Sequence, residues 1–286
     1  MRASAVPSNN AGWLRSVAVF YLLAFAISWL IELPLAAASR GLLHLQLPGI
    51  VAFLSPLAPM LAALIVSVGE GGIAEAGRLL RRLLWWRVGL WWWVAVLLGF
   101  PALALVAIGL TSLATAHGPD FSDNFIRSAL PQFPRTLSPW LLVPPFLLYS
   151  MVTSIPEEVG WRGFALPRLQ DRAGAVYASL AVGALWALWH LPLFFNPQAV
   201  QIGISFPLFF AATLSGSMLF TWVFNGTGGS LLMVAFLHSS FNAGNVFLPL
   251  LPQVTGTQLQ LVLYFGVITL VGFVLVASGH LRSVRA

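Results

Sequence analysis

The chain has 286 residues, of which 59% are hydrophobic and only 8% are charged, and its mean hydropathy is +0.88. Such a composition favours lipid over water and excludes an ordinary soluble domain. The net charge of +6 comes entirely from arginine, and no basic face with phosphate spacing lies outside the short loops, so we expect no nucleic-acid partner. Because the chain has no cysteine, disulfides, thiolate metal sites and cysteine nucleophiles are excluded.

Clusters of glycine, proline and arginine divide the chain into apolar segments that are long enough to cross a membrane. We therefore predict an all-α fold, a polytopic transmembrane helical bundle of about eight helices, and a single transmembrane domain over residues 1–286. The first apolar run is about as long as a full span needs, so we interpret it as a helix and not as a cleavable signal peptide. The predicted spans are residues 13–38, 48–68, 88–115, 140–170, 174–195, 205–224, 229–250 and 259–279.

The distribution of arginine predicts the orientation in the membrane. An even number of spans places both termini on one side, and positively charged loops stay in the cytoplasm. With both termini cytoplasmic, only Arg40, Arg127 and Arg135 fall outside. The arginines that then fall inside are Arg2, Arg15, Arg78, Arg81, Arg82, Arg87, Arg162, Arg168, Arg172, Arg282 and Arg285. We therefore predict a multi-pass cell-membrane protein with both ends in the cytoplasm.

Two adjacent carboxylates and an arginine lie within the fourth predicted span, at Glu157, Glu158 and Arg162. An ionisable group in hydrocarbon costs several kcal/mol unless it faces a polar cavity or a partner. Glu158 and Arg162 are four residues apart, so they can form an ion pair within one helix. Pro156 is expected to bend or restart this helix. The spacing from Ser154 to Glu157 also matches a capping box, which would give one carboxylate a purely structural role.

Polar groups on two further spans are predicted to lie at a similar depth. Glu157 precedes the turn at residues 171–174 by about 15 residues and His190 follows it by about 18, so at the helical rise both lie roughly 22 to 27 Å from that turn. His238 and Asn242 lie one helical turn apart on another span, about 15 to 20 Å deep. Convergence on one cavity would keep all four side chains out of lipid.

These residues also carry a family resemblance, which covers residues 140–245. The chain resembles the CAAX protease and bacteriocin-processing family of intramembrane endopeptidases. Three motifs of that family occur here in order: E-E-x-x-x-R over residues 157–162, F-x-x-x-H with Trp in place of Phe over residues 186–190, and H-x-x-x-N over residues 238–242. The resemblance implies a bundle of about eight helices, a prokaryotic plasma membrane, and peptide-bond hydrolysis within or at the edge of the membrane. The substrates that it implies are lipidated C-terminal tails, leader peptides or sorting signals.

Amide hydrolysis needs a base, a stabiliser for the oxyanion and an acid for the leaving amine, and the motif residues can supply all three. We predict that Glu157 is the general base that activates water and that His190 orients this water or binds a metal. His238 and Asn242 would hold the oxyanion. Glu158 and Arg162 would support the site, and the arginine would meet a substrate carboxylate.

The sequence leaves the metal question open. Glu157, His190 and His238 form the ligand set of many hydrolytic zinc sites, so zinc is the candidate cofactor and a metalloprotease is one reading. The His-Glu-x-x-His motif is absent, however, and the same residues can act through glutamate-activated water with no ion. Our interpretation leans toward no permanently bound metal.

Two other function classes stay open. Glu157 and the histidines could form the relay of a proton- or ion-coupled transporter, although we find no inverted repeat. The fold could also serve as a non-catalytic scaffold or bacteriocin-immunity protein. A lone histidine in a membrane helix often makes only an interhelical hydrogen bond. We expect Glu32 to face the loop or the headgroups. The histidines expected to be solvated are His44, His117 and His280.

Overall fold

The computed structural model describes residues 10–44, 49–122, 124–129, 132, 134 and 136–281. These residues form helices and connecting turns, with no strand in the described ranges, which confirms the all-α prediction. Of the arginines used to predict orientation, four lie outside the described residues: Arg2, Arg135, Arg282 and Arg285. The start of the second predicted span, residue 48, also lies outside them.

Most of the predicted spans correspond to one helix each. The long helices are α1 (Asn10–Ser39), α2 (Ala58–Arg81), α3 (Leu90–Thr115), α5 (Val143–Glu158), α6 (Leu166–Trp189), α7 (Phe206–Gly226), α8 (Leu231–Phe247) and α10 (Leu259–Ala277). The shorter elements are η1 (Gly49–Leu57), η2 (Arg82–Leu84), α4 (Phe125–Ala129), η3 (Pro139–Leu142), the π-helical η4 (Val159–Ala165), η5 (Leu191–Phe195), η6 (Val200–Gly203) and α9 (Pro252–Thr255).

Seven helical segments of the described chain are long and apolar enough to cross a membrane. The fourth of them, Pro139–Phe195, has 57 residues and contains a break at Gly174, where φ is 76° and ψ is 169°. Glycine adopts this positive φ at little steric cost because it has no Cβ atom. The chain reverses there, since Glu157 and Trp186 on either side of the break touch. The segment therefore holds the fourth and fifth predicted spans, and the predicted turn at residues 171–174 is confirmed.

Two local predictions differ from the structure. Ser154 lies inside α5 and bonds to other serines, so it caps no helix and the capping-box reading is wrong. α5 also continues through Pro156 without a restart, and the irregularity follows it as the π-helical turn η4. π-Helical turns insert one extra residue per turn and often occur at functional sites.

The second predicted span is longer than expected, because α2 continues to Arg81. Its backbone leaves helical geometry at Gly71 and Gly72, where φ is −147° and 66°. The glycines allow a sharp bend that divides an apolar first half from a second half whose last turn holds Arg78 and Arg81. The bend therefore carries α2 from the apolar band into the polar end of the molecule.

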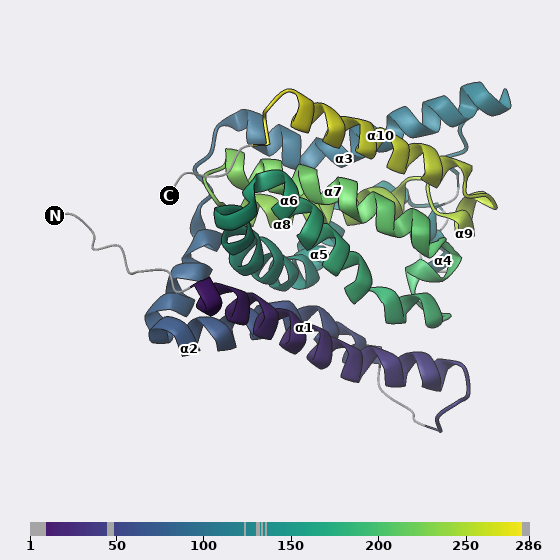
Figure 1. Ribbon diagram of the computed structural model, residues 1–286. Coiled ribbons are helices and arrows are strands. Elements are labelled where there is room, and N and C mark those ends of the chain that lie inside the picture. The colour runs from purple at the N-terminus through teal and green to yellow at the C-terminus, as the bar shows by residue number, and fades with distance from the viewer. Residues whose placement is uncertain are drawn as a thin grey trace.

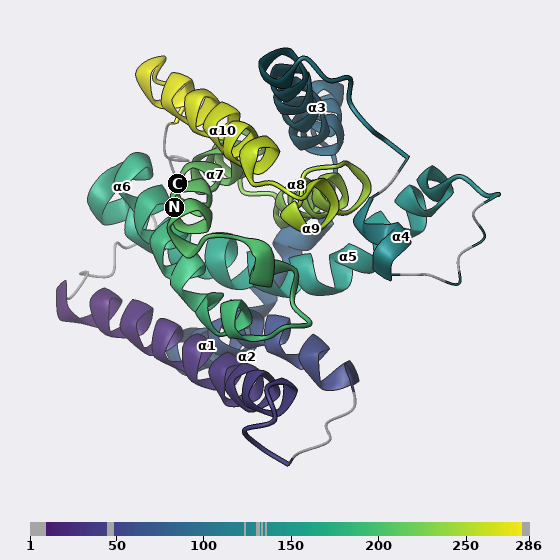
Figure 2. The ribbon, with the colours of Figure 1, turned by 90° about the vertical axis from the view of Figure 1, so that its right-hand side faces the viewer.

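The helix α5 lies near the centre of the bundle, with α1 and α2 on one side and α3, α7, α8 and α10 on the other (Figures 1 and 2). α5 packs against α8, α6 against α7, and α3 and α7 against α10. η4 packs against α2 so closely that a Cβ atom at Gly160 would lie 2.5 Å from the Cβ of Pro59. Gly160, two residues after the acidic pair, is therefore in close contact with α2.

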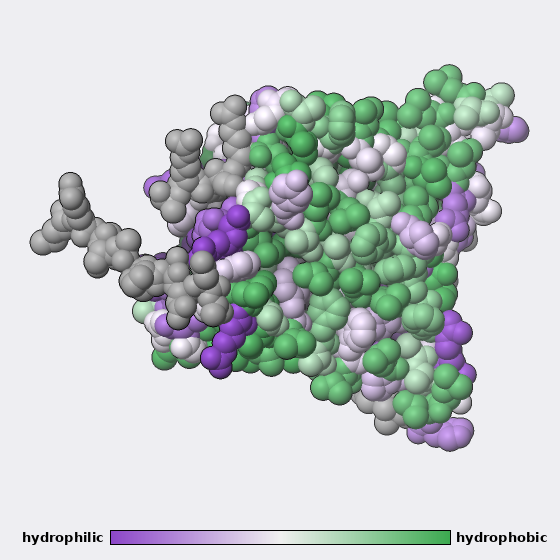
Figure 3. Space-filling model, viewed as in Figure 1, coloured by the Kyte–Doolittle hydropathy of each residue, from purple (hydrophilic) through white to green (hydrophobic). Residues whose placement is uncertain are grey.

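An apolar band crosses the surface between two more polar ends (Figure 3). α1 begins and α10 ends at the same end of the bundle, whereas α4 and α9 lie at the opposite end (Figure 1). Because α1 begins and α10 ends at the same end of the bundle, the arrangement agrees with an even number of crossings. Together with the seven long apolar segments, this band shows that the protein is a multi-pass membrane protein.

Candidate active site

Glu158 and Arg162 form the predicted ion pair. Nη1 of Arg162 donates to both carboxylate oxygens of Glu158, at 3.0 and 3.1 Å, and neither side chain has exposed surface. The two residues are separated by a turn that changes from α to π geometry. A fully buried pair of this kind is tolerated because each charge compensates the other.

Arg162 is enclosed on its remaining sides. Its guanidinium lies over the rings of Trp186 at 4.6 Å and Phe220 at 4.3 Å, as expected for a cation between aromatic faces. Its Nη2 donates to Ser217 Oγ at 3.5 Å. The exposed fraction of Arg162 is 0%. A substrate carboxylate has no access to this guanidinium, so the expectation that Arg162 meets one is wrong in this structure.

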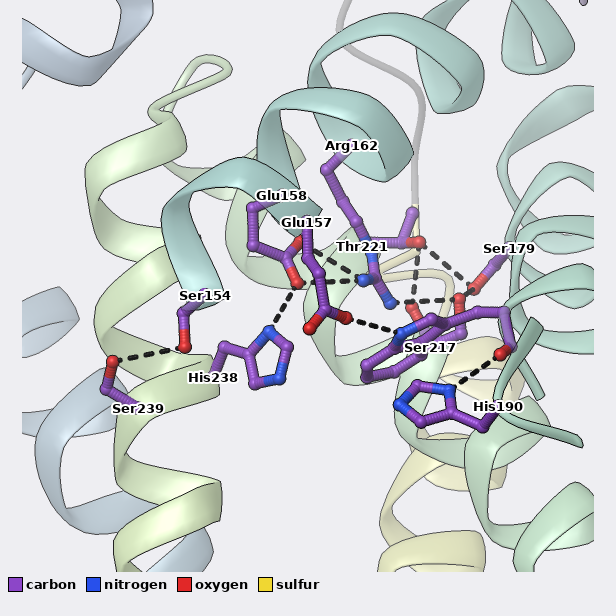
Figure 4. A network of polar contacts seen from close by, with 11 residues as sticks. Ser154, Glu157, Glu158, Arg162, Ser179, His190, Ser217, Thr221, His238 and Ser239 are labelled. Atoms are coloured by element: carbon purple, nitrogen blue, oxygen red, sulfur yellow. Dashed lines mark hydrogen bonds and ion pairs between the residues drawn. The ribbon is translucent and has the colours of Figure 1, made fainter. Parts of the chain in front are cut away.

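Glu158 also reaches across to α8. Its Oε1 lies 2.8 Å from Nδ1 of His238. Because the carboxylate is paired with Arg162, we treat it as ionised and as the acceptor, so Nδ1 carries the proton. One buried carboxylate thus fixes both the arginine and the histidine, and Nε2 of His238 remains directed away from Glu158 (Figure 4).

Glu157 faces a different neighbour. Its Oε2 accepts a hydrogen bond from Nε1 of Trp186 at 2.9 Å, and the residue is 5% exposed. Among the described residues, no protein group donates a hydrogen bond to its other oxygen. The motif pattern identifies Trp186 only as an aromatic residue and does not predict this contact. The general tendency of a buried indole N–H to find an acceptor is the signal that points to it.

His190 follows Trp186 by one helical turn. Its Nδ1 lies 2.8 Å from the backbone oxygen of Trp186, and since a carbonyl can only accept, Nδ1 carries the proton. Neutral His190 therefore presents a bare Nε2. The indole of Trp186 touches both histidine rings, with centroids 5.7 Å from His190 and 5.4 Å from His238. Figure 4 shows the two histidine rings and the Glu157 carboxylate directed toward the same region.

Asn242 is held by a chain of hydroxyl groups that the sequence did not reveal. Its Nδ2 donates to Ser150 Oγ at 3.0 Å, Ser150 lies 3.5 Å from Ser154, and Ser239 donates to Ser154 at 3.3 Å. These serines join α5 to α8. The amide group of Asn242 is thereby fixed in orientation while its second N–H stays available.

A cavity of about 90 Å³ brings the predicted residues together. His190, His238 and Asn242 line it, together with Trp186, the partner of Glu157. The structure therefore places three of the four converging residues directly on one hollow and the fourth against its wall. Glu158 and Arg162 do not line it.

A second cavity, of about 380 Å³, adjoins the first. The lining residues that the two share include Gln201 of η6 and Asn242 of α8. It is bounded also by Phe125 of α4 and by Leu251, which precedes α9. α4, η6 and α9 belong to the end of the bundle opposite the start of α1 (Figure 1). The cavity system therefore extends from the polar site toward that end.

The residues proposed as metal ligands do not form a ligand group. Within the described parts of the chain, no group of three or more histidine or carboxylate side chains is arranged to hold a metal ion. The set Glu157, His190 and His238 does not fit zinc in this arrangement, and we assign no step to a metal.

Other polar residues are also placed by the structure. His44, His117 and His280 are exposed, as predicted. Glu32 is 7% exposed, so the expectation that it faces the loop or the headgroups is wrong. The cause is η1, which folds back against α1 and covers it.

Comparison with known proteins gives two matches to the part of the chain that holds the site. Residues 139–244 match the model of the type II CAAX prenyl endopeptidase Rce1-like family. The chain is also similar to CAAX prenyl protease 2 of Methanococcus maripaludis, with 30% identity over 107 residues, which is 34% of this chain and 38% of that protein. The match therefore spans well under half of the relative.

Proposed function

We propose that this chain is a membrane-embedded endopeptidase that hydrolyses a peptide bond with a glutamate-activated water, because residues 139–244 match the Rce1-like CAAX prenyl endopeptidase family. One observation carries the mechanism. His190 and His238 each leave a free nitrogen on one cavity, and Glu157, bonded to its wall, leaves a free carboxylate oxygen. A substrate carbonyl and a water in that cavity would meet a base and two hydrogen-bonding groups.

Glu157 is the proposed general base. Its free oxygen takes one proton from water as the water oxygen attacks the carbonyl carbon. The other O–H of the water stays intact and donates a hydrogen bond to the bare Nε2 of His190, which orients the attack. The proton held by Glu157 then passes to the amide nitrogen, the C–N bond breaks, and the amine leaves. Trp186 keeps the carboxylate facing the cavity during both transfers.

His238 and Asn242 are the proposed oxyanion donors. The second N–H of Asn242 is free to donate, because only one is used by Ser150. Nε2 of His238 can donate only when the imidazole carries both protons, since Nδ1–H already faces Glu158. The Glu158 carboxylate stabilises that imidazolium and holds its orientation, as the carboxylate does in a Ser-His-Asp triad. Glu158 and Arg162 therefore position His238 without touching the substrate.

The proposed substrate carries an apolar group beside the scissile bond. Aromatic side chains dominate the walls of both cavities, and the lining aromatics include Phe209, Phe241 and Phe265. The smaller cavity has room for the reacting groups and little more, whereas the larger one can accept a bulky side chain or part of a lipid. An apolar peptide segment or a lipidated tail would fit this division.

Cleavage by the purified protein tests the proposal. In proteoliposomes we expect cleavage of peptides that carry a prenylated C-terminal tail or an apolar leader segment, with products identified by mass spectrometry. The same vesicles, loaded with a pH-sensitive dye, report proton flux. Cleavage without proton movement supports the peptidase. Flux without cleavage of any peptide in the panel would instead support the coupled transporter.

Replacing Trp186 by Phe tests how the base is held. A smaller aromatic ring still faces His190 and His238, but the N–H donated to Glu157 is lost. A hydrogen bond to a charged group contributes about 1.5–3 kcal/mol, so we expect Trp186→Phe to lower kcat by about 10- to 100-fold with KM nearly unchanged. Trp140→Phe, an exposed indole, is the control. An unchanged kcat would remove Trp186 from the mechanism.

The arginine distribution supports an entrance on the outer face. Among the described residues, more arginines lie at the end where α1 starts than at the opposite end, which holds Arg40 and Arg127. The cavities extend toward this opposite, arginine-poor end. A substrate would then approach from outside the cell or from the outer leaflet.

Cysteine labelling checks this orientation, because the natural chain has no cysteine. Asp171→Cys lies in the turn between the fourth and fifth spans, and Thr257→Cys lies between α9 and α10; both positions are exposed. In intact cells we expect an impermeant maleimide to label Thr257→Cys and to spare Asp171→Cys. The reverse labelling would place the cavity on the cytoplasmic face and would favour a cytoplasmic lipidated tail as substrate.

A further inference from the structure

A third hollow, of about 500 Å³, lies apart from the two cavities of the candidate active site. It shares no lining residue with them. Its walls come mainly from the second half of α2, with Ser67 from before the bend, from η2 and Trp85 after it, and from the junction of η4 with α6. We name it the arginine hollow after the polar residues that line it: Arg78, Arg81, Arg82 and Arg168, with Glu75 and Ser67.

The positive charge of the arginine hollow exceeds its negative charge. Arg78 pairs with Glu75, and Arg168 pairs with Glu70 at 2.7 Å. Arg81 and Arg82 form no ion pair with a carboxylate among the described residues. The four guanidinium groups of the hollow therefore exceed the two carboxylates near them, Glu70 and Glu75, by two positive charges.

Arg82 has an unmet hydrogen-bonding requirement. Its Nη1 is shielded from solvent and donates to no acceptor among the described residues. On one side the guanidinium faces the ring of Phe224, at 5.8 Å from the centroid, which offers no lone pair. A shielded N–H without an acceptor costs about 1–3 kcal/mol, and more when the group is charged. An oxygen-rich anion in the hollow would satisfy it.

The position of the hollow indicates the kind of anion. It lies beyond the bend at Gly71 and Gly72, where α2 leaves the apolar band, and Trp85 forms part of its wall. Tryptophan and arginine mark the depth of lipid headgroups. Arginine binds phosphate through paired N–H donors, and basic pockets between membrane helices bind anionic headgroups.

We propose that the arginine hollow binds the phosphate of an anionic phospholipid, with Arg81 and Arg82 as its principal donors. The lipid tails then run along the apolar surface. The headgroup links α2 to the η4–α6 junction through Arg168, whose Nη1 donates to the backbone oxygen of Phe164. This proposal does not depend on the peptidase proposal, since the two sites share no residue.

Thermal unfolding in a neutral detergent tests the site. We expect phosphatidylglycerol to raise the melting temperature of the purified protein more than phosphatidylcholine does, and native mass spectrometry to detect a bound anionic lipid. The double variant Arg81→Gln/Arg82→Gln should lose most of this shift, with at least a tenfold weaker apparent affinity. Arg15→Gln, an exposed arginine at the same end that lines no described cavity, makes the same change of charge per residue and should keep the full shift.

Three results would overturn the proposal. One is an equal response of the protein to both lipids. Another is an equal loss of response in Arg15→Gln, which would indicate only general attraction to charge. The third is a full shift produced by inorganic phosphate alone, which would indicate a site for the free ion. If the double variant does not fold, Arg81→Gln alone gives the same test, because Arg81 is exposed and lines the hollow.

Discussion

Replacing Glu157 by Gln is expected to abolish peptide cleavage while the protein stays folded. The amide has nearly the shape of the carboxylate and keeps an oxygen that can accept the Trp186 N–H. It cannot take a proton from water. Since general acid–base catalysis contributes about 10²- to 10⁴-fold and Glu157 would act in both transfers, we expect kcat to fall by about 10³-fold or more. Single-turnover cleavage measured by mass spectrometry gives the number.

The matched control for this variant is Asp171→Asn. Asp171 is an exposed carboxylate in the turn after the same helix, so the change of charge is equal and the site is untouched. We expect wild-type kcat and an unchanged melting temperature. Retained cleavage by Glu157→Gln would remove the proposed base. A loss shared by both variants would show that activity responds to net charge and not to the site.

The main spans and the convergence of the motif residues could be predicted from the sequence, because both follow from elementary geometry. Helical rise sets depth, and the turn at residues 171–174 aligns Glu157 with the fifth span. The structure bears this out through the contact between Glu157 and Trp186 and through the cavity shared by His190, His238 and Asn242.

The division of labour between the two carboxylates could not be predicted in full. The i, i+4 rule gave the pair Glu158–Arg162, but nothing in the sequence says which face of α8 meets α5. That interhelical contact gives Glu158 its second partner, His238, and gives Asn242 its serine partner, Ser150. Rotations of helices about their own axes are set by packing, which one chain's pattern does not encode.

The bend in α2 could not be predicted for a related reason. A glycine cluster predicts the end of a span, whereas Gly71 and Gly72 redirect a helix that continues to Arg81. The consequence is functional, because the continued helix supplies Arg78 and Arg81 to the arginine hollow. The arginines that predict the orientation in the membrane therefore also line a hollow.

The buried charges differ from one another in what holds them. Glu158 has two strong partners and no exposed surface, so it is fixed in place. Glu157 has one partner and 5% exposure, so one of its oxygens is available for chemistry. In the proposed mechanism, the fixed carboxylate of Glu158 positions His238 and the available carboxylate of Glu157 reacts with water.

Replacing Arg162 by Met is expected to cause the largest loss of stability in the chain. The thioether fills similar space between the rings of Trp186 and Phe220, but the carboxylate of Glu158 is left buried with His238 as its only partner. Removing one member of a buried ion pair costs about 3–5 kcal/mol. We expect a loss of that size in the free energy of unfolding, measured by titration with a denaturing detergent from mixed micelles.

Two further variants separate this cause from a general packing defect. The double variant Glu158→Gln/Arg162→Met removes both charges of the pair, so it leaves no unpaired carboxylate. It should therefore be more stable than Arg162→Met alone if the unpaired carboxylate causes the loss of stability. Arg78→Met breaks the surface pair with Glu75, where the side chains are 57% and 33% exposed, and such pairs contribute about 0–1 kcal/mol. A double variant less stable than Arg162→Met would show that the arginine supports the fold by its shape, and that Glu158 can remain buried without it.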